Sequence, residues 1–89
     1  MNNNEVIIVG KVVEELNKYI KDGVHYGSLL IEAKSKYEMN TPIIKCIFAG
    51  PTLEKIDNNI SKGDILNIEA HLIMEDNNIE VIVDEVNPQ

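Results

Sequence analysis

The sequence has no arginine, no tryptophan and a single cysteine, Cys46. One cysteine cannot form an internal disulfide, and its neighbours Ile44, Ile47 and Phe48 indicate a small buried hydrophobe rather than a reactive thiol. The longest uncharged apolar stretch, residues 6–10, is far shorter than the roughly 20 residues that a membrane-spanning helix needs. The N-terminus also lacks a basic region followed by an apolar one, so we expect a cytoplasmic protein without a membrane partner.

Signatures of catalysis and of cofactor binding are also missing. The sequence has no glycine-rich phosphate loop, and no serine lies in a nucleophile motif. His25, Cys46 and His71 do not have the short spacing of the ligands in a structural zinc site. We therefore expect a protein that is not an enzyme and that uses no metal and no cofactor.

The length and charge limit the remaining possibilities. A chain of 89 residues has room for one domain, 1–89, and its 44% hydrophobic and 26% charged residues are typical of a folded protein. Its net charge is -7, so its mean electrostatic field repels a polyanion. Any nucleic-acid site must therefore be a local patch.

Alternation of apolar residues predicts an all-β chain with one short helix, in the order β-β-β-α-β-β. Gly10 predicts a bulge or a bend in the first strand, and Thr52 is a candidate cap for the helix. Residues 15–24 are expected to form a connecting loop or a loose strand extension. A helix between the third and fourth of five strands is typical of the OB barrel. The expected strands are 5–14, 25–35, 42–49, 64–75 and 79–86, and the expected helix is 52–61.

Three stretches, 4–12, 44–72 and 79–86, resemble the bacterial single-stranded DNA-binding (SSB) family. The first contains an asparagine and an apolar run before a glycine and a lysine. The second has the family's strand, helix, lysine-glycine turn and strand, and the third is similar to its last strand. The resemblance implies an OB barrel that binds extended single strands by base stacking and phosphate contacts.

The sequence also departs from that family. Ala49 stands where the family usually has a stacking tryptophan, and Phe48, one position earlier, faces the other side of the strand. The long loop between the last two strands is reduced to about residues 76–78, and the acidic tail is absent. Primosomal relatives of the family are also SSB-like barrels without the tail, and this chain resembles them in that respect. Replication or primosome proteins are therefore candidate partners.

The candidate nucleic-acid surface combines lysines with tyrosines near the second and third strands, where OB barrels usually bind. Its members are Lys11, Tyr26, Lys34, Lys36, Tyr37 and Lys45. An alternative is that these lysines are solvent-exposed and keep the sheet edges from pairing with other chains, and that the tyrosines cover the mouth of the barrel.

The first strand has apolar residues on both faces, which favours an interface between subunits. One small barrel cannot hold all of its apolar side chains in its interior when these include Ile7, Val9, Ile43 and Ile47. The hypothesis is a homo-oligomer, a dimer or a tetramer, that pairs through Ile7 and Val9. The alternative is that residues 15–24 or the helix cover these side chains.

Two hypotheses for the function follow. The first is an SSB-like module that binds single-stranded DNA weakly and in a salt-sensitive way, in DNA replication, repair or recombination. The second is a protein-interaction OB domain that has lost nucleic-acid binding, which is favoured by the acidic charge, the missing arginine and Ala49.

Overall fold

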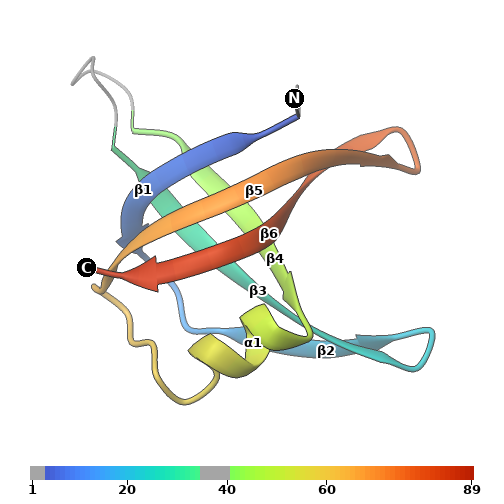
Figure 1. The fold of residues 1–89 in the computed structure, drawn as a ribbon, viewed down its shortest axis with the longest axis horizontal. Coiled ribbons are helices and arrows are strands. Elements are labelled where there is room, and N and C mark those ends of the chain that lie inside the picture. Colours follow the sequence, from blue (N-terminus) through green and yellow to red (C-terminus); the bar gives the residue numbers. More distant parts are fainter. Residues whose placement is uncertain (1–3, 35–40) are drawn as a thin grey trace.

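The computed structural model describes residues 4–34 and 41–89, and in this part of the chain one sheet closes on itself. The sheet runs in the order β1-β5-β6-β4-β3-β2, and an additional pairing of β1 with β3 closes it (Figure 1). All the pairings are antiparallel except that of β4 with β6. The elements are β1 (Val6–Val12), β2 (Asn17–Lys21), β3 (Val24–Ala33), β4 (Ile43–Ala49), α1 (Pro51–Ile56), β5 (Ile65–Glu75) and β6 (Asn78–Pro88).

The interior is filled by alternate residues of the strands. Phe48, Leu29, Ile31, Leu66 and Ile68 are fully buried, as expected for the inward face of a half-buried strand. Cys46 lies in the same core, and burial raises the pKa of its thiol to about 12. The prediction that this cysteine is a buried hydrophobe is confirmed.

Gly10 is the residue at which β1 passes from one neighbouring strand to the other. It is paired with Leu66 on β5 and with Ala33 on β3. A Cβ atom at this position would collide with the carbonyl of Glu32 and the side chain of Ile31. The absence of a side chain therefore permits the close approach that closes the barrel.

Residues 15–24 contain a strand, β2, so residues 4–34 and 41–89 together form six strands, one more than predicted. β2 pairs with the start of β3, and Asp22 and Gly23 form the tight turn between them with φ angles of 52° and 78°. Two consecutive positive φ angles are the mark of a type I′ hairpin turn, for which Asp-Gly is a strong signal. Of the two alternatives for residues 15–24, the strand is the one observed, and the loop was left open because the two apolar residues of β2 are too few to show a clear alternation.

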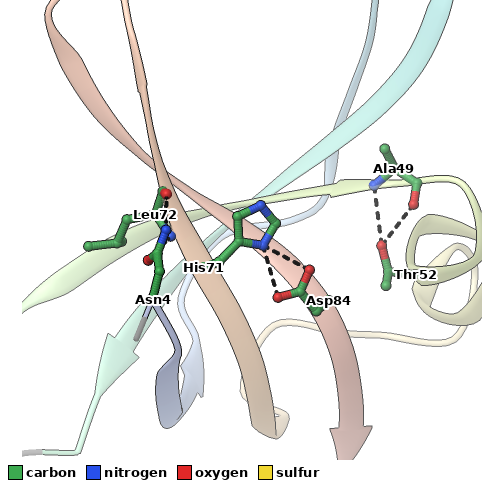
Figure 2. A network of polar contacts seen from close by, with 6 residues as sticks. All are labelled: Asn4, Ala49, Thr52, His71, Leu72 and Asp84. Atoms are coloured by element: carbon green, nitrogen blue, oxygen red, sulfur yellow. Dashed lines mark hydrogen bonds and ion pairs between the residues drawn. The ribbon is translucent and has the colours of Figure 1, made fainter. Parts of the chain in front are cut away.

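The helix is shorter than predicted and is capped differently. It ends at Ile56 because Asp57 is extended and Asn58 adopts a left-handed φ of 66°. Its N-cap is Gly50 and not Thr52, and Pro51 occupies the first helical position. The Thr52 hydroxyl instead donates to the Ala49 carbonyl at 2.9 Å and accepts from the Ala49 N–H at 3.2 Å (Figure 2).

The β5–β6 hairpin has the predicted tight turn, and its strands extend beyond the core. Asp76 and Asn77 both have positive φ, as in a type I′ turn. Met74 and Ile79 are paired across the hairpin and are 69% and 67% exposed. The ends of the β2–β3 and β5–β6 hairpins project on the same side of the barrel (Figure 1).

The start of the chain is attached to this hairpin by one side chain. The Asn4 amide donates to the Leu72 carbonyl at 2.7 Å and accepts from the Leu72 N–H at 2.9 Å (Figure 2). This contact continues the β1–β5 ladder, in which Val6 is paired with Ala70, by one further step.

No helix in the described part of the chain is long and apolar enough to cross a membrane.

Candidate nucleic-acid interface

A groove of about 430 Å³ lies between the two hairpins. One wall comes from β2 and the start of β3, the other from the end of β5 and the start of β6, and β4 contributes Lys45 and Ile47. Its lining residues are Asn17, Tyr19, Lys21, Asp22, Tyr26, Lys45, Ile47, Ile73, Glu75, Glu80 and Ile82. The groove is therefore formed by side chains on the outer face of the sheet, because the inner face is filled by the core.

Two tyrosines form an aromatic platform in the groove. Tyr19 and Tyr26 are paired across β2 and β3, with ring centroids 5.5 Å apart and planes inclined by 22°. This is a stacked geometry that aromatic pairs favour, and both partly exposed rings line the groove. Partial burial, followed by the nearby charge of Glu80, raises the pKa of Tyr19.

Charges of both signs line the groove. Lys21 reaches across it, with its Nζ 2.8 Å from Oε1 of Glu75. Lys45 is exposed and has no ion pair with any residue that the structure describes. Asp22 and Glu80 add two further carboxylates to that of Glu75. Beside the two tyrosines, the groove thus contains Lys45, which has no ion pair with a described residue, and Lys21, which is paired with Glu75.

The structure separates the predicted surface residues into two groups. Tyr26 and Lys45 line the groove together. Lys11 is paired with Glu32 in the β1–β3 ladder, six residues beyond Tyr26 along β3, which corresponds to about 20 Å of strand. Lys34 follows the end of β3 and donates its backbone N–H to the Val9 carbonyl at 2.8 Å. Lys11 and Lys34 are exposed, but they lie outside the groove.

Lys36 and Tyr37 fall in residues 35–40, outside the described residues. The strand predicted over 25–35 ends at Ala33 in the structure, so Lys34 follows the strand and is not part of it.

Sequence reasoning missed the groove residues on β2 and on the last hairpin. Tyr19 and Lys21 were overlooked because residues 15–24 were expected to be a connecting loop or a loose strand extension, and not a regular strand of the binding face. Asp22-Gly23, between two stretches that each hold a tyrosine, was the signal that could have identified them. Glu75 and Glu80 carry no such signal, because acidic residues are common throughout this chain.

The expected directions of Phe48 and Ala49 are confirmed. Phe48 is fully buried in the core, and Ala49 lies on the outer face, directly opposite Tyr26 in the β3–β4 ladder. The position at which the resemblance implies a stacking ring is thus next to the tyrosine platform and carries only a methyl group.

The outer face of β1 carries the predicted interface residues. Ile7 is 64% exposed, so neither residues 15–24 nor α1 covers it, and Val9 is half-buried. Ile7 is paired with Glu69 on β5, and Glu69 is paired in turn with Glu85 on β6. A hydrogen bond between these two carboxyl groups, and the charge of Glu85, raise the pKa of Glu69.

No metal centre is formed by the histidine, cysteine and carboxylate side chains that the structure describes. His71 is placed on β5 with its Nδ1 2.8 Å from Oδ1 of Asp84 (Figure 2). Cys46 is buried in the core, away from both histidines, which are at least partly exposed.

Neither a protein-family model nor a curated protein matches the sequence. Solved structures do match. The chain is similar to Rim1, a mitochondrial single-stranded DNA-binding protein from S. cerevisiae, with a TM-score of 0.86, 16% identity and coverage of 100% of this chain and 97% of that one. A small single-stranded DNA-binding protein from Streptomyces coelicolor has a TM-score of 0.84, 11% identity and coverage of 100% and 95%.

A third similar structure is the dimeric N-terminal domain of PriB from Thermoanaerobacter tencongensis. Its TM-score is 0.82, with 19% identity and coverage of 99% of this chain and 98% of that one. These likenesses establish the fold: the chain is an OB-type barrel of the kind found in single-stranded DNA-binding proteins. The predicted fold class is therefore confirmed, with one strand more than expected.

Proposed function

We propose that this chain binds single-stranded DNA in the groove between its two hairpins, weakly and with strong salt dependence, as part of DNA replication, repair or recombination. The observation that carries the proposal is the stacked pair of Tyr19 and Tyr26 beside Lys45. Single-strand binding needs a π-face for the bases and a cation for the phosphates, and this groove presents both. The fold shared with proteins that are named as single-stranded DNA-binding proteins supports the same conclusion.

The expected affinity is low for two reasons. Each stacked base contributes roughly 1–3 kcal/mol, and Ala49 leaves one stacking position without a ring. The groove has only two lysines, one of which is paired with Glu75, and the net charge of -7 repels a polyanion at long range. Salt must therefore weaken the few phosphate contacts that remain.

We also propose that the binding species is a homo-oligomer that pairs through β1. Among the described residues, β1 is paired with β3 only at Gly10–Val12 and Val9 accepts from the Lys34 N–H, so the segment from Val6 to Ile8 has β5 as its only neighbouring strand. Ile7 leaves a large apolar side chain exposed on this same segment. The β1 strand of a second copy, paired alongside this segment, would bind its unpaired backbone N–H and C=O groups and bury the Ile7 side chain.

The test is a titration of fluorescent oligo-dT, followed by anisotropy, at several salt concentrations. The wild-type protein should bind at low salt and lose affinity steeply as salt rises. Lys45→Ala should reduce the magnitude of the salt slope by about 0.7, the value for one phosphate contact on a single strand. Lys62→Ala removes an exposed lysine outside the groove and is the matched control.

A second candidate function is a protein-interaction domain without nucleic-acid binding. It is favoured by the three carboxylates of Asp22, Glu75 and Glu80, which outnumber the lysines of the groove. Absence of oligo-dT binding even at low salt would contradict the DNA-binding proposal and support this alternative.

A further inference from the structure

The ion pair between Lys21 and Glu75 connects the two walls of the groove. Lys21 is the last residue of β2 and Glu75 the last residue of β5, so the pair links the ends of two separate hairpins. The contact, at 2.8 Å, raises the pKa of Lys21 and lowers that of Glu75. Both groups are therefore charged throughout the neutral pH range, and the bridge across the groove is maintained there.

A second carboxylate of the same hairpin faces the other binding groups. β4 and β6 run parallel with Cys46 opposite Val81, and Lys45 and Glu80, the residues that precede this pair, both line the groove. Glu80 also lies close enough to Tyr19 for its charge to raise the pKa of that phenol. The β5–β6 hairpin thus brings two carboxylates into the groove that contains Lys21 and Lys45, and one of them is in contact with Lys21.

We propose that the β5–β6 hairpin is an autoinhibitory element in which the carboxylates of Glu75 and Glu80 compete with phosphates for Lys21 and Lys45. This inference rests on the proposed function. A phosphate at Lys21 must compete with the Glu75 carboxylate for the same ammonium group, and the two anions repel each other when both lie close to it. Glu80 opposes a phosphate at Lys45 in the same way, and at short range salt screens this repulsion only partly.

Removing one carboxylate should therefore increase the affinity for a single strand. In Glu75→Gln the neutral amide no longer holds Lys21, so that this lysine is free to bind a phosphate. Affinity for oligo-dT at low salt should rise by roughly 3-fold to 10-fold, and the magnitude of the salt slope should increase by up to about 0.7, since one additional phosphate is neutralised. Glu80→Gln should act in the same direction, and the double variant should bind most tightly.

The control variant is Glu15→Gln, which makes the same change in net charge at an exposed residue outside the groove. Its affinity should differ from that of the wild type by less than about 2-fold, as expected when only the long-range field changes. Lys21→Gln supplies a second control, because Glu75→Gln in that background has no lysine to release. The gain from Glu75→Gln should then fall to that of Glu15→Gln.

The outcomes separate this inference from the proposed function. Tighter binding by Glu75→Gln than by Glu15→Gln, dependent on Lys21, supports the competition. A wild type that binds oligo-dT in the groove while Glu75→Gln binds no tighter than Glu15→Gln overturns the inference and leaves the proposed function intact. Absence of binding by the wild type and by every variant overturns both.

Discussion

Ala49 stands directly opposite Tyr26 on the outer face of the β3–β4 ladder. Side chains at directly opposed positions have Cβ atoms about 4.5–5.5 Å apart, so a ring at Ala49 would contact Tyr26. The stacked tyrosines and the alanine therefore occupy one continuous surface, in which a position suited to an aromatic ring is filled by a methyl group.

Ala49→Trp should strengthen binding to oligo-dT because it adds a stacking platform beside Tyr26. The expected gain is roughly 1–3 kcal/mol, about 5-fold to 150-fold in Kd. The chain has no other tryptophan, so quenching of the new emission by DNA measures the contact directly. Met74→Trp places the same fluorophore at an exposed site outside the groove, and equal quenching in both variants would argue against the prediction.

Tyr26→Ala should lower affinity without changing the salt slope, since stacking on an aromatic ring does not release counterions. A loss of roughly 5-fold to 150-fold is expected, equivalent to about 1–3 kcal/mol. Tyr26→Phe keeps the ring and should retain most of the affinity. Anisotropy titrations at three salt concentrations distinguish the two effects, and a changed slope in Tyr26→Ala would show that the residue acts on phosphate contacts.

Ile7→Lys should dissociate the proposed oligomer, because it puts a charge at the exposed apolar residue of the β1 edge. Light scattering should give a mass above that of one 10.0 kDa chain for the wild type and the mass of one chain for the variant. Met74→Lys introduces the same charge at a comparably exposed residue on another face and should leave the mass unchanged. A wild type that is monomeric at high concentration would refute the oligomer.

Glu69→Gln should raise Tm at pH 7 and lose this advantage as the pH falls. The folded state raises the pKa of Glu69 through its hydrogen bond with Glu85, so the stabilising contribution of that bond is complete below the ordinary value of 4.5 and is lost as the pH rises through the raised value. At pH 7 both carboxylates are charged and repel each other, and glutamine removes this repulsion. A difference in Tm that is equal at pH 7 and near pH 4.5 would contradict this explanation.

Much of the barrel could be predicted from the sequence because its strands bury one face in a regular alternation. Leu66, Ile68 and Ala70 show that pattern clearly, and β5 was predicted to within one residue of its observed bounds. The tight turn at residues 76–78 was likewise evident from residue types that tolerate positive φ. β2 could not be predicted in this way, since it is the last strand in the order of the sheet and none of its residues is fully buried.

The candidate site was only partly predictable, since it depends on contacts between distant segments. Tyr26 and Lys45 were selected because OB barrels bind near their second and third strands, and both line the groove. The pairing of Lys21 with Glu75 joins residues 54 positions apart and leaves no local pattern in the sequence. Lys11 and Lys34 were grouped with Lys45 as lysines near the second and third strands, but both lie near the far end of β3 and outside the groove.

The most direct test of the central proposal is an NMR titration of the isotopically labelled protein with unlabelled oligo-dT at low salt. Backbone amide shifts should change most along β2, at the start of β3 and around Lys45, and much less at Lys62 and around α1. The phenol rings of Tyr19 and Tyr26 should shift upfield as bases stack on them. Saturable shifts confined to other faces of the barrel, with the groove unchanged, would contradict the proposed site.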